Sequence, residues 1–164
     1  MSEARVPGSG AVLAAAVGIG MVAAARTFLM PALLSRSLRT ERGASSEKGP
    51  ARLLASPAAG TALWLVAAGE LVGDKLPITP DRTRAASLAA RAFSGAFSAA
   101  AYASSRREPM APAALVGAIG AIGGAYLLLH ARRAAGRRLD VPDPFVAVAE
   151  DVAATAVGYT IARR

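Results

Sequence analysis

The sequence lacks cysteine entirely and has one histidine, His130, among its 164 residues. These absences exclude a disulfide framework, a cysteine-based zinc site, a thiol nucleophile and a metal site built from several histidines. Charged residues make up only 18% of the chain, against about 25% in an ordinary soluble domain, and hydrophobic residues reach 54%. Because the apolar residues, mostly Ala, Leu and Val, form long runs, the composition predicts an integral membrane protein.

Positive charge exceeds negative charge, with 19 Lys and Arg against 11 Asp and Glu. Such an excess is typical of nucleic-acid binding, of anionic-lipid binding or of loops that flank membrane spans. Here the arginines gather between the apolar runs, chiefly over residues 36–52 and 132–138. We therefore expect a lipid bilayer as partner and no nucleic acid, with headgroup binding by the Arg-rich loops as a weaker alternative.

Five segments approach the roughly 20 apolar residues that a membrane-spanning helix needs. They are residues 11–34, 53–72, 85–103, 111–130 and 145–161. Since no stretch alternates like a strand, the sequence predicts an all-α bundle of about five spans, a single multi-pass domain of the cell membrane. Residues 11–25, the first part of this segment, have the length of a signal-peptide core. Because the flank before them is only weakly positive and apolar sequence resumes over residues 27–34, we interpret residues 11–34 as a retained span. Lysine and arginine divide almost equally between the two sides, so the positive-inside rule decides no orientation, and homo-oligomer formation stays open.

Ionisable side chains within or beside the spans are the candidate functional residues, because a charge in hydrocarbon costs several kcal/mol. The set consists of Arg26, Glu70, Asp74, Arg91, Glu150 and Asp151. If the chain crosses the membrane five times, the four carboxylates converge on one half of it. These acids then face only two deep arginines, so at least one acid should lack a permanent cation.

The third segment carries a polar stripe, whose members follow one another at intervals of three and four residues. The stripe consists of Ser87, Arg91, Ser94 and Ser98. A polar stripe on a membrane helix must face the bundle interior or water. Glu70 and Asp74, which share one face of the second segment, are the natural acids to meet it, with Arg91 as their expected countercharge.

Two functions fit this set of residues. In the first, the protein is a cation- or proton-coupled transporter or a channel-like protein, whose carboxylates bind a cation or relay protons. In the second, it is a structural or scaffolding membrane protein without transport activity, and the buried charges only fix the helix register. We expect no enzyme, no catalytic residue, no metal site and no cofactor, because the sequence contains neither Gly-x-Ser-x-Gly nor His-Glu-x-x-His.

Four strings in the sequence form a recognisable set. They are Arg-Thr-Phe-Leu-Met-Pro at 26–31, Gly-Glu-Leu-Val-Gly-Asp-Lys-Leu-Pro at 69–77, Arg-Ala-Phe-Ser-Gly at 91–95 and Ala-Glu-Asp at 149–151. Their order and spacing resemble a family of small bacterial integral membrane proteins, domain-of-unknown-function family 4126. The resemblance covers nearly the whole chain, although the chain is short for the family and its first loop is unusually polar. It implies a membrane location and draws attention to these positions, and it implies no activity.

Overall fold

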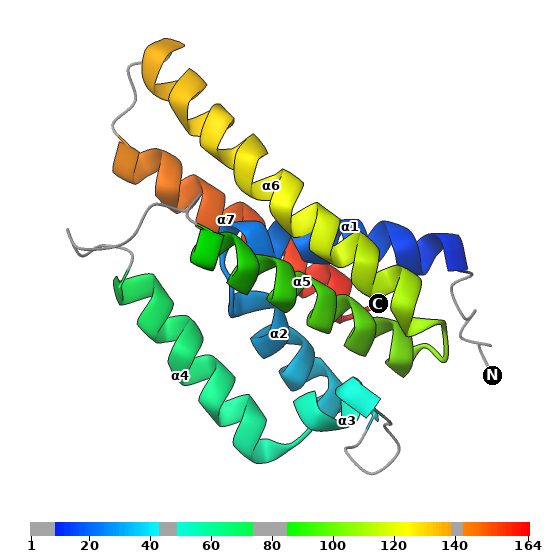
Figure 1. Ribbon diagram of the computed structural model, residues 1–164. Helices are drawn as coiled ribbons and strands as arrows, with labels where there is room; N and C mark the ends of the chain where they lie inside the picture. The colour runs from blue at the N-terminus through cyan, green and yellow to red at the C-terminus, as the bar shows by residue number, and fades with distance from the viewer. Residues whose placement is uncertain (1–8, 43–48, 74–84, 139–142) are drawn as a thin grey trace.

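The computed structural model describes residues 9–42, 49–73, 85–138 and 143–164, and every regular element in these ranges is helical (Figure 1). The elements are α1 (Ser9–Ala25), α2 (Leu29–Ser37), the π-helical turn η1 (Leu38–Arg42), α3 (Gly49–Leu54), α4 (Pro57–Gly73), α5 (Ala85–Ser105), α6 (Met110–Arg138) and α7 (Asp143–Ala162). The predicted all-α class is therefore confirmed for this part of the chain.

Helices α1, α5 and α6 form the centre of the bundle, and α6 touches both α1 and α5 through glycines. A Cβ atom placed on Gly20 of α1 would lie 2.5 Å from the carbonyl oxygen of Gly117 on α6. Gly95 of α5 is equally close to Gly117, and Gly120 lies against Val17 of α1. The small residues let the helix backbones approach each other directly, as van der Waals packing in an apolar solvent favours.

Two of the five predicted segments are not continuous helices. Residues 11–34 divide into α1 and α2, and residues 53–72 divide between α3 and α4. The second division has a local cause, because the hydroxyl of Ser56 accepts a hydrogen bond from the N–H of Ala59 at 3.2 Å and Pro57 occupies the first position of α4. The other three segments fall within α5, α6 and α7, and α6 is longer than predicted.

The chain reverses direction between α1 and α2, so these helices form a hairpin (Figure 1). Ser9, at the start of α1, donates a hydrogen bond to Glu108 at 2.9 Å, and Ser37, at the end of α2, donates one to the carbonyl of Ala162 at 2.5 Å. The start of α1 and the end of α2 thus lie at one end of the bundle, which we call the terminal end. The connecting residues Arg26–Phe28, the hairpin tip, lie toward the other end.

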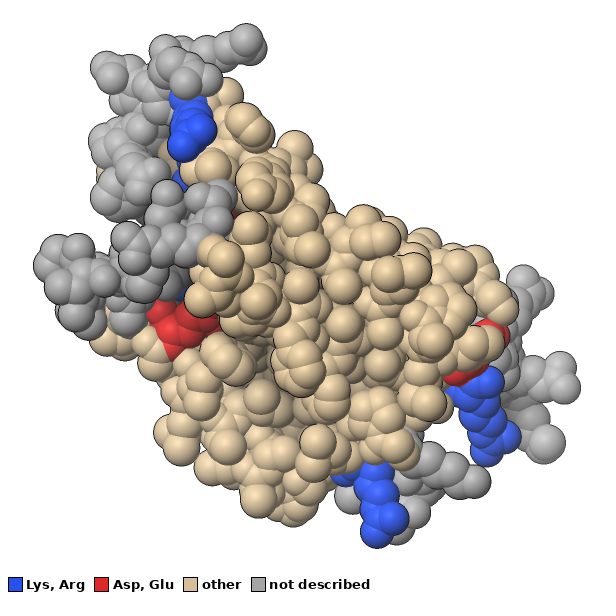
Figure 2. All heavy atoms as spheres, in the orientation of Figure 1, with Lys and Arg blue, Asp and Glu red and all other residues tan. Residues whose placement is uncertain are grey.

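Much of the surface formed by the described helices is apolar. Met110–Ala135 and Phe145–Ala162 are long and apolar enough to cross a membrane. Only 28% of the most apolar 18-residue stretch of the first helix and 22% of that of the second are buried. A core helix of a soluble protein would be mostly buried, so these helices present their apolar side chains outward. Figure 2 shows a face whose broad middle has no charged side chain and whose charges lie toward its edges. Large exposed side chains include Leu65, Phe93, Leu115, Ile119, Phe145 and Val152.

Candidate functional site

The hairpin tip exists because the helix of α1 is unable to continue through Pro31. Proline has no N–H and its ring collides with the carbonyl four residues earlier, which here belongs to Thr27. The last helical bond of α1 runs from the N–H of Arg26 to the carbonyl of Val22 at 2.8 Å, and α2 begins with a bond from Ala32 to Phe28 at 3.2 Å. Between these two bonds the peptide N–H and C=O groups have no helical hydrogen-bond partners, so each buried one needs a different partner.

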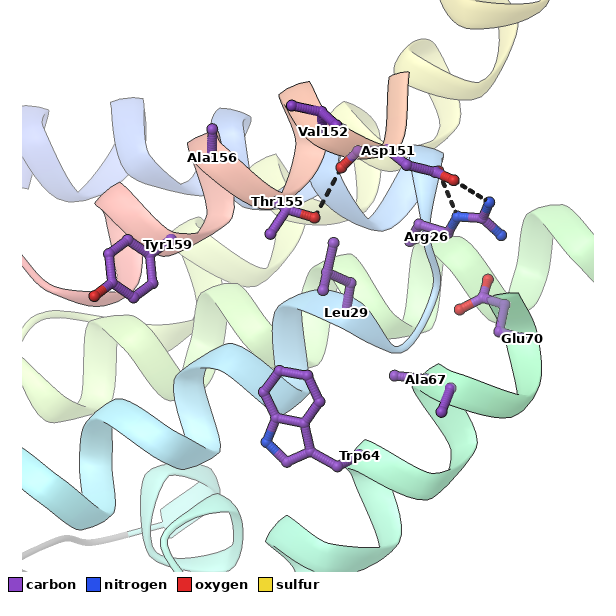
Figure 3. A pocket seen from close by; sticks show the side chains of 11 residues that line it. Arg26, Leu29, Trp64, Ala67, Glu70, Asp151, Val152, Thr155, Ala156 and Tyr159 are labelled. Carbon is purple, nitrogen blue, oxygen red and sulfur yellow. Dashed lines mark hydrogen bonds and ion pairs between the residues drawn. The ribbon is translucent and has the colours of Figure 1, made fainter. Parts of the chain in front are cut away.

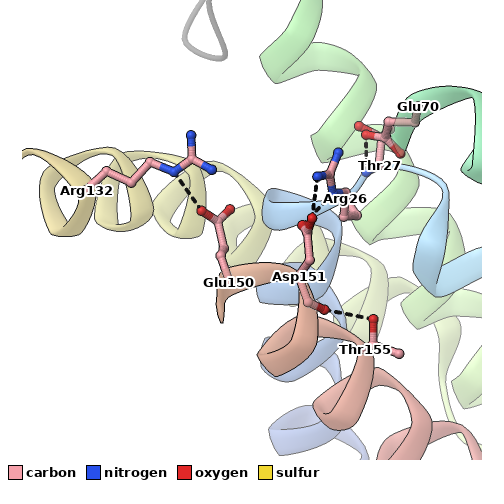
Figure 4. Close-up of polar contacts among 7 residues, drawn as sticks. All are labelled: Arg26, Thr27, Glu70, Arg132, Glu150, Asp151 and Thr155. Carbon is pink, nitrogen blue, oxygen red and sulfur yellow. Dashed lines mark hydrogen bonds and ion pairs between the residues drawn. The ribbon is translucent and has the colours of Figure 1, made fainter. Parts of the chain in front are cut away.

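Glu70, in the last turns of α4, supplies acceptors to the tip. Its Oε1 accepts a hydrogen bond from the N–H of Thr27 at 2.7 Å, and its Oε2 accepts one from the N–H of Phe28 at 3.0 Å. A negative charge is favourable there, because the first N–H groups of α2 carry the positive end of the helix dipole. Glu70 therefore caps α2 from a different helix (Figure 4).

The polar stripe of α5 supplies donors to the same tip. The Arg91 guanidinium donates to the carbonyl of Ala24, and the Ser94 hydroxyl donates to the carbonyl of Thr27, the oxygen that Pro31 leaves without a helical donor. Both side chains are buried. Arg91 also donates to Ser87 within its own helix, from Nε to Oγ at 3.3 Å. The stripe thus satisfies peptide oxygens where α1 ends.

Arg26, at the tip itself, forms a two-point ion pair with Asp151 of α7 (Figure 4). Its Nε lies 2.7 Å from Oδ1 and its Nη2 lies 2.6 Å from Oδ2, the geometry that arginine and carboxylate favour. The Arg26 side chain is 9% exposed and that of Asp151 is 24% exposed. The pair fastens α7 to the point where the chain reverses.

The structure corrects the predicted pairing of charges. Arg91 was the expected countercharge of Glu70, but Glu70 binds peptide N–H groups and Arg91 binds a peptide carbonyl. Glu150 lies on another side of α7 and pairs with Arg132 of α6, whose Nε is 2.9 Å from Oε2. Asp74 lies outside the described residues. Among the described residues, no group of three or more His, Cys, Asp or Glu side chains could hold a metal ion.

A groove of about 670 Å³ runs beside the tip (Figure 3). The charged side chains of Arg26, Glu70 and Asp151 lie at one end of it. The rest of the lining comes from α2, α4 and α7, and it is apolar or aromatic except for the hydroxyl of Thr155. These residues are Leu29, Trp64, Ala67, Ala68, Val152, Thr155, Ala156 and Tyr159. The lining resembles that of small-molecule sites, which combine a mostly apolar wall with a few polar groups.

Two buried serines of the stripe should respond differently to removal of their hydroxyls. Ser94→Ala removes the donor to the Thr27 carbonyl and should lower the free energy of unfolding by about 1–3 kcal/mol, because a buried acceptor is left unpaired. Ser98→Ala is the matched control: the Ser98 Oγ has no hydrogen-bond partner within the described part of the chain, so its loss should be neutral or stabilising. Denaturant titration of the two variants in detergent measures the difference. Equal losses would show that Ser94 does not support the tip.

The chain matches no family model, no curated protein and no solved structure. The resemblance to family 4126 therefore stays a prediction. The function is inferred from the site itself, because a fold alone does not fix an activity.

Proposed function

We propose that the protein is a multi-pass membrane protein in which α4, α5, α6 and α7 cross the bilayer and α1 and α2 form a re-entrant hairpin. The apolar, outward-facing surfaces of α6 and α7 support this arrangement. Helix α5, with 21 residues, is about 31 Å long, which matches the hydrocarbon core. Non-helical backbone inside a membrane requires protein partners, and the tip receives them from Glu70, Arg91 and Ser94.

This arrangement differs from five crossings in one measurable way, because it places Ser9 and Arg164 on the same side of the membrane. Single cysteines are clean reporters, since the chain has none of its own. Ser9→Cys and Arg164→Cys should react with an impermeant maleimide from one side, and Arg133→Cys should react from the other side. Reaction of the first two from opposite sides of oriented vesicles would contradict the re-entrant hairpin and restore an odd number of crossings.

We further propose that the protein is a small proton- or cation-coupled transporter and that Glu70 is its proton-carrying group. The observation that carries this proposal is the bonding of Glu70 at the tip. Its carboxylate lines the groove and accepts two peptide N–H groups, and no Lys or Arg of the described residues pairs with it. Intramembrane acids of this kind are the usual proton carriers of transporters.

The tip couples the charge of Glu70 to the backbone. When a proton binds one carboxyl oxygen, that oxygen becomes a donor and the group loses its negative charge. The N–H of Thr27 or Phe28 then loses a charged acceptor, and the attraction to the positive end of α2 falls. Protonation therefore favours a different position of α2 against α4, which changes the groove between them. A carboxylate held by Arg91 alone would have no such link to the backbone.

The rival function, a structural protein without transport, has support from the two ion pairs. Arg26–Asp151 and Arg132–Glu150 each join α7 to another segment and could fix the helix register. The two functions differ in what Glu70 does. A structural protein needs Glu70 only as a cap, so its removal should reduce stability and leave no ion flux to lose.

Proton flux in reconstituted vesicles tests the proposal. Wild-type protein with an entrapped pH dye should show flux that depends on one of a panel of monovalent and divalent cations or on added organic cations. Glu70→Gln should remove at least about 90% of that flux, because the amide binds no proton at these pH values. Glu108→Gln is the control: this acid bonds Ser9 at the terminal end and should leave the flux unchanged. Absence of flux from folded wild-type protein for every cation would refute the transport function.

A further inference from the structure

We propose that the groove beside the hairpin tip binds a lipophilic organic cation, a molecule with an apolar body and one positive charge. This inference rests on the proposed transport function, for which it names the class of cargo. It follows from three independent properties of the groove: its size and lining, its charge and its aromatic side chains.

The size and lining select an apolar molecule. A volume of about 670 Å³ lies within the range of about 300–1,000 Å³ that is typical of small-molecule sites. Leu29 forms part of the wall from α2, while Ala67 and Ala68 of α4 and Val152 and Ala156 of α7 form the flanks. The alanines leave the space open. A hydrated inorganic ion would find few oxygen ligands along this wall, whereas an apolar body would be desolvated favourably.

The charge of the groove selects a cation. Three of its lining side chains carry a charge, and two of them, Arg26 and Asp151, neutralise each other through paired hydrogen bonds. The remaining one is Glu70, whose partners in the described chain are neutral peptide groups. A positive charge at this end would approach Glu70 without breaking the Arg26–Asp151 pair. An anion would face a carboxylate, and the one arginine among the described lining residues is already engaged with Asp151.

The aromatic residues add a preference for positive charge. Trp64 lies in the groove wall with 38% of its surface exposed, so its indole is available to a ligand. Tyr159, further along, already has a cation over its ring, since the Arg163 guanidinium carbon lies 5.2 Å from the ring centre. Indole is the ring that attracts cations most strongly. Figure 3 shows Trp64 and Glu70 on the same helix, with Leu29 and Arg26 across the groove.

Trp64 also provides the measurement, because it is the only tryptophan of the chain. Tetraphenylphosphonium and tetraphenylborate have the same shape and opposite charge. Each is titrated into purified protein in a nonionic detergent while Trp64 emission is recorded. Equilibrium dialysis against protein-free micelles gives an independent binding curve that corrects for partition into detergent. Trp64→Phe should remove the emission change while dialysis still detects binding.

Two variants of α7 locate the ligand. Ala156→Leu fills the proposed groove, whereas Ala153→Leu adds the same side chain to a second groove of about 440 Å³ among α1, α6 and α7. We expect Ala156→Leu to weaken tetraphenylphosphonium binding at least about tenfold and Ala153→Leu to leave it unchanged. Glu70→Gln should weaken binding of the cation by about tenfold and leave binding of the anion unchanged, because only the charge is removed.

The expected result is saturable binding of the phosphonium ion, with binding of the borate at least about tenfold weaker. Equal binding of both ions, no saturable binding, or an unchanged Ala156→Leu variant would overturn the inference. If Glu70→Gln fails to fold, the comparison of tetraphenylphosphonium with tetraphenylborate and the variants Ala156→Leu and Ala153→Leu still test the inference. Phosphonium binding without proton flux would refute only the transport function. Proton flux without phosphonium binding would refute only this class of cargo.

Discussion

Gly117→Ala is expected to be among the most destabilising single-methyl changes in this protein. The added Cβ would lie closest to the carbonyl oxygen of Gly95, and it would lie 2.7 Å from the Cβ of Ala99 and 3.0 Å from the carbonyl carbon of Gly95. The obstacle on α5 includes backbone, which has no rotamer to change, so α5 and α6 must move apart. Overpacking costs about 1–3 kcal/mol and sometimes more, and we expect a loss of unfolding free energy near the upper limit.

Gly123→Ala is the matched control for Gly117→Ala. It adds the same methyl group six residues further along α6, where a Cβ would meet nothing within 4 Å. Alanine is the better helix former, so this variant should be neutral or more stable by up to about 1 kcal/mol. Unfolding of both variants in detergent, followed by circular dichroism, compares them. Similar stabilities would contradict the close approach of α5 and α6.

Asp151→Asn is expected to cost about 3 kcal/mol of stability, because it removes the charged partner of a mostly buried arginine. Arg26→Gln should have a loss of similar size. The double variant should be less destabilised than the sum of the two by at least about 1 kcal/mol, since each change removes the same pair. The measurement is a double-mutant cycle on the free energy of unfolding in detergent.

The exposed hydrogen bond between Ser9 and Glu108 provides the comparison for this cycle. Glu108→Gln should change stability by less than about 0.5 kcal/mol, because surface interactions of this kind contribute little. Additive losses in the Arg26 and Asp151 cycle would show that the pair does not hold α7 to the hairpin tip. Glu70, Arg91 and Ser94 would then have to hold the tip without α7.

The choice of residues for the site came largely from the sequence. An ionisable group in an apolar run is conspicuous, so Arg26, Glu70, Arg91 and Asp151 were candidates before any contact was known. The spacing of Ser94 and Ser98 placed both on one helix face, and both are buried. Hydropathy shows which residues are charged within an apolar run, and the helical period shows which residues share a face. Both can be read from neighbouring positions in the sequence.

The assignment of partners could not be predicted in the same way. Which group Glu70 meets depends on the depth and rotation of α4 against α2, and these are set by contacts between distant segments. The charges alone predicted that Glu70 would meet Arg91, whereas the partners of Glu70, Arg91 and Ser94 at the tip are peptide groups. Pro31 was the available signal, since a proline frees the carbonyl of Thr27. Glu150 was grouped with Asp151 because they are adjacent, yet neighbouring helix positions point about 100° apart.

By itself the sequence determined that the chain is helical, apolar on its outside and charged at a few interior points. These properties follow from composition and period, which hold for any arrangement of the helices. Only the tertiary structure decided that α1 and α2 form a hairpin. A reversal over Arg26–Phe28 interrupts an apolar run by one charge, so hydropathy counts one span where there are two antiparallel helices. The direction of α2 is fixed by its distant bonds, from Thr27 to Glu70 at one end and from Ser37 to Ala162 at the other.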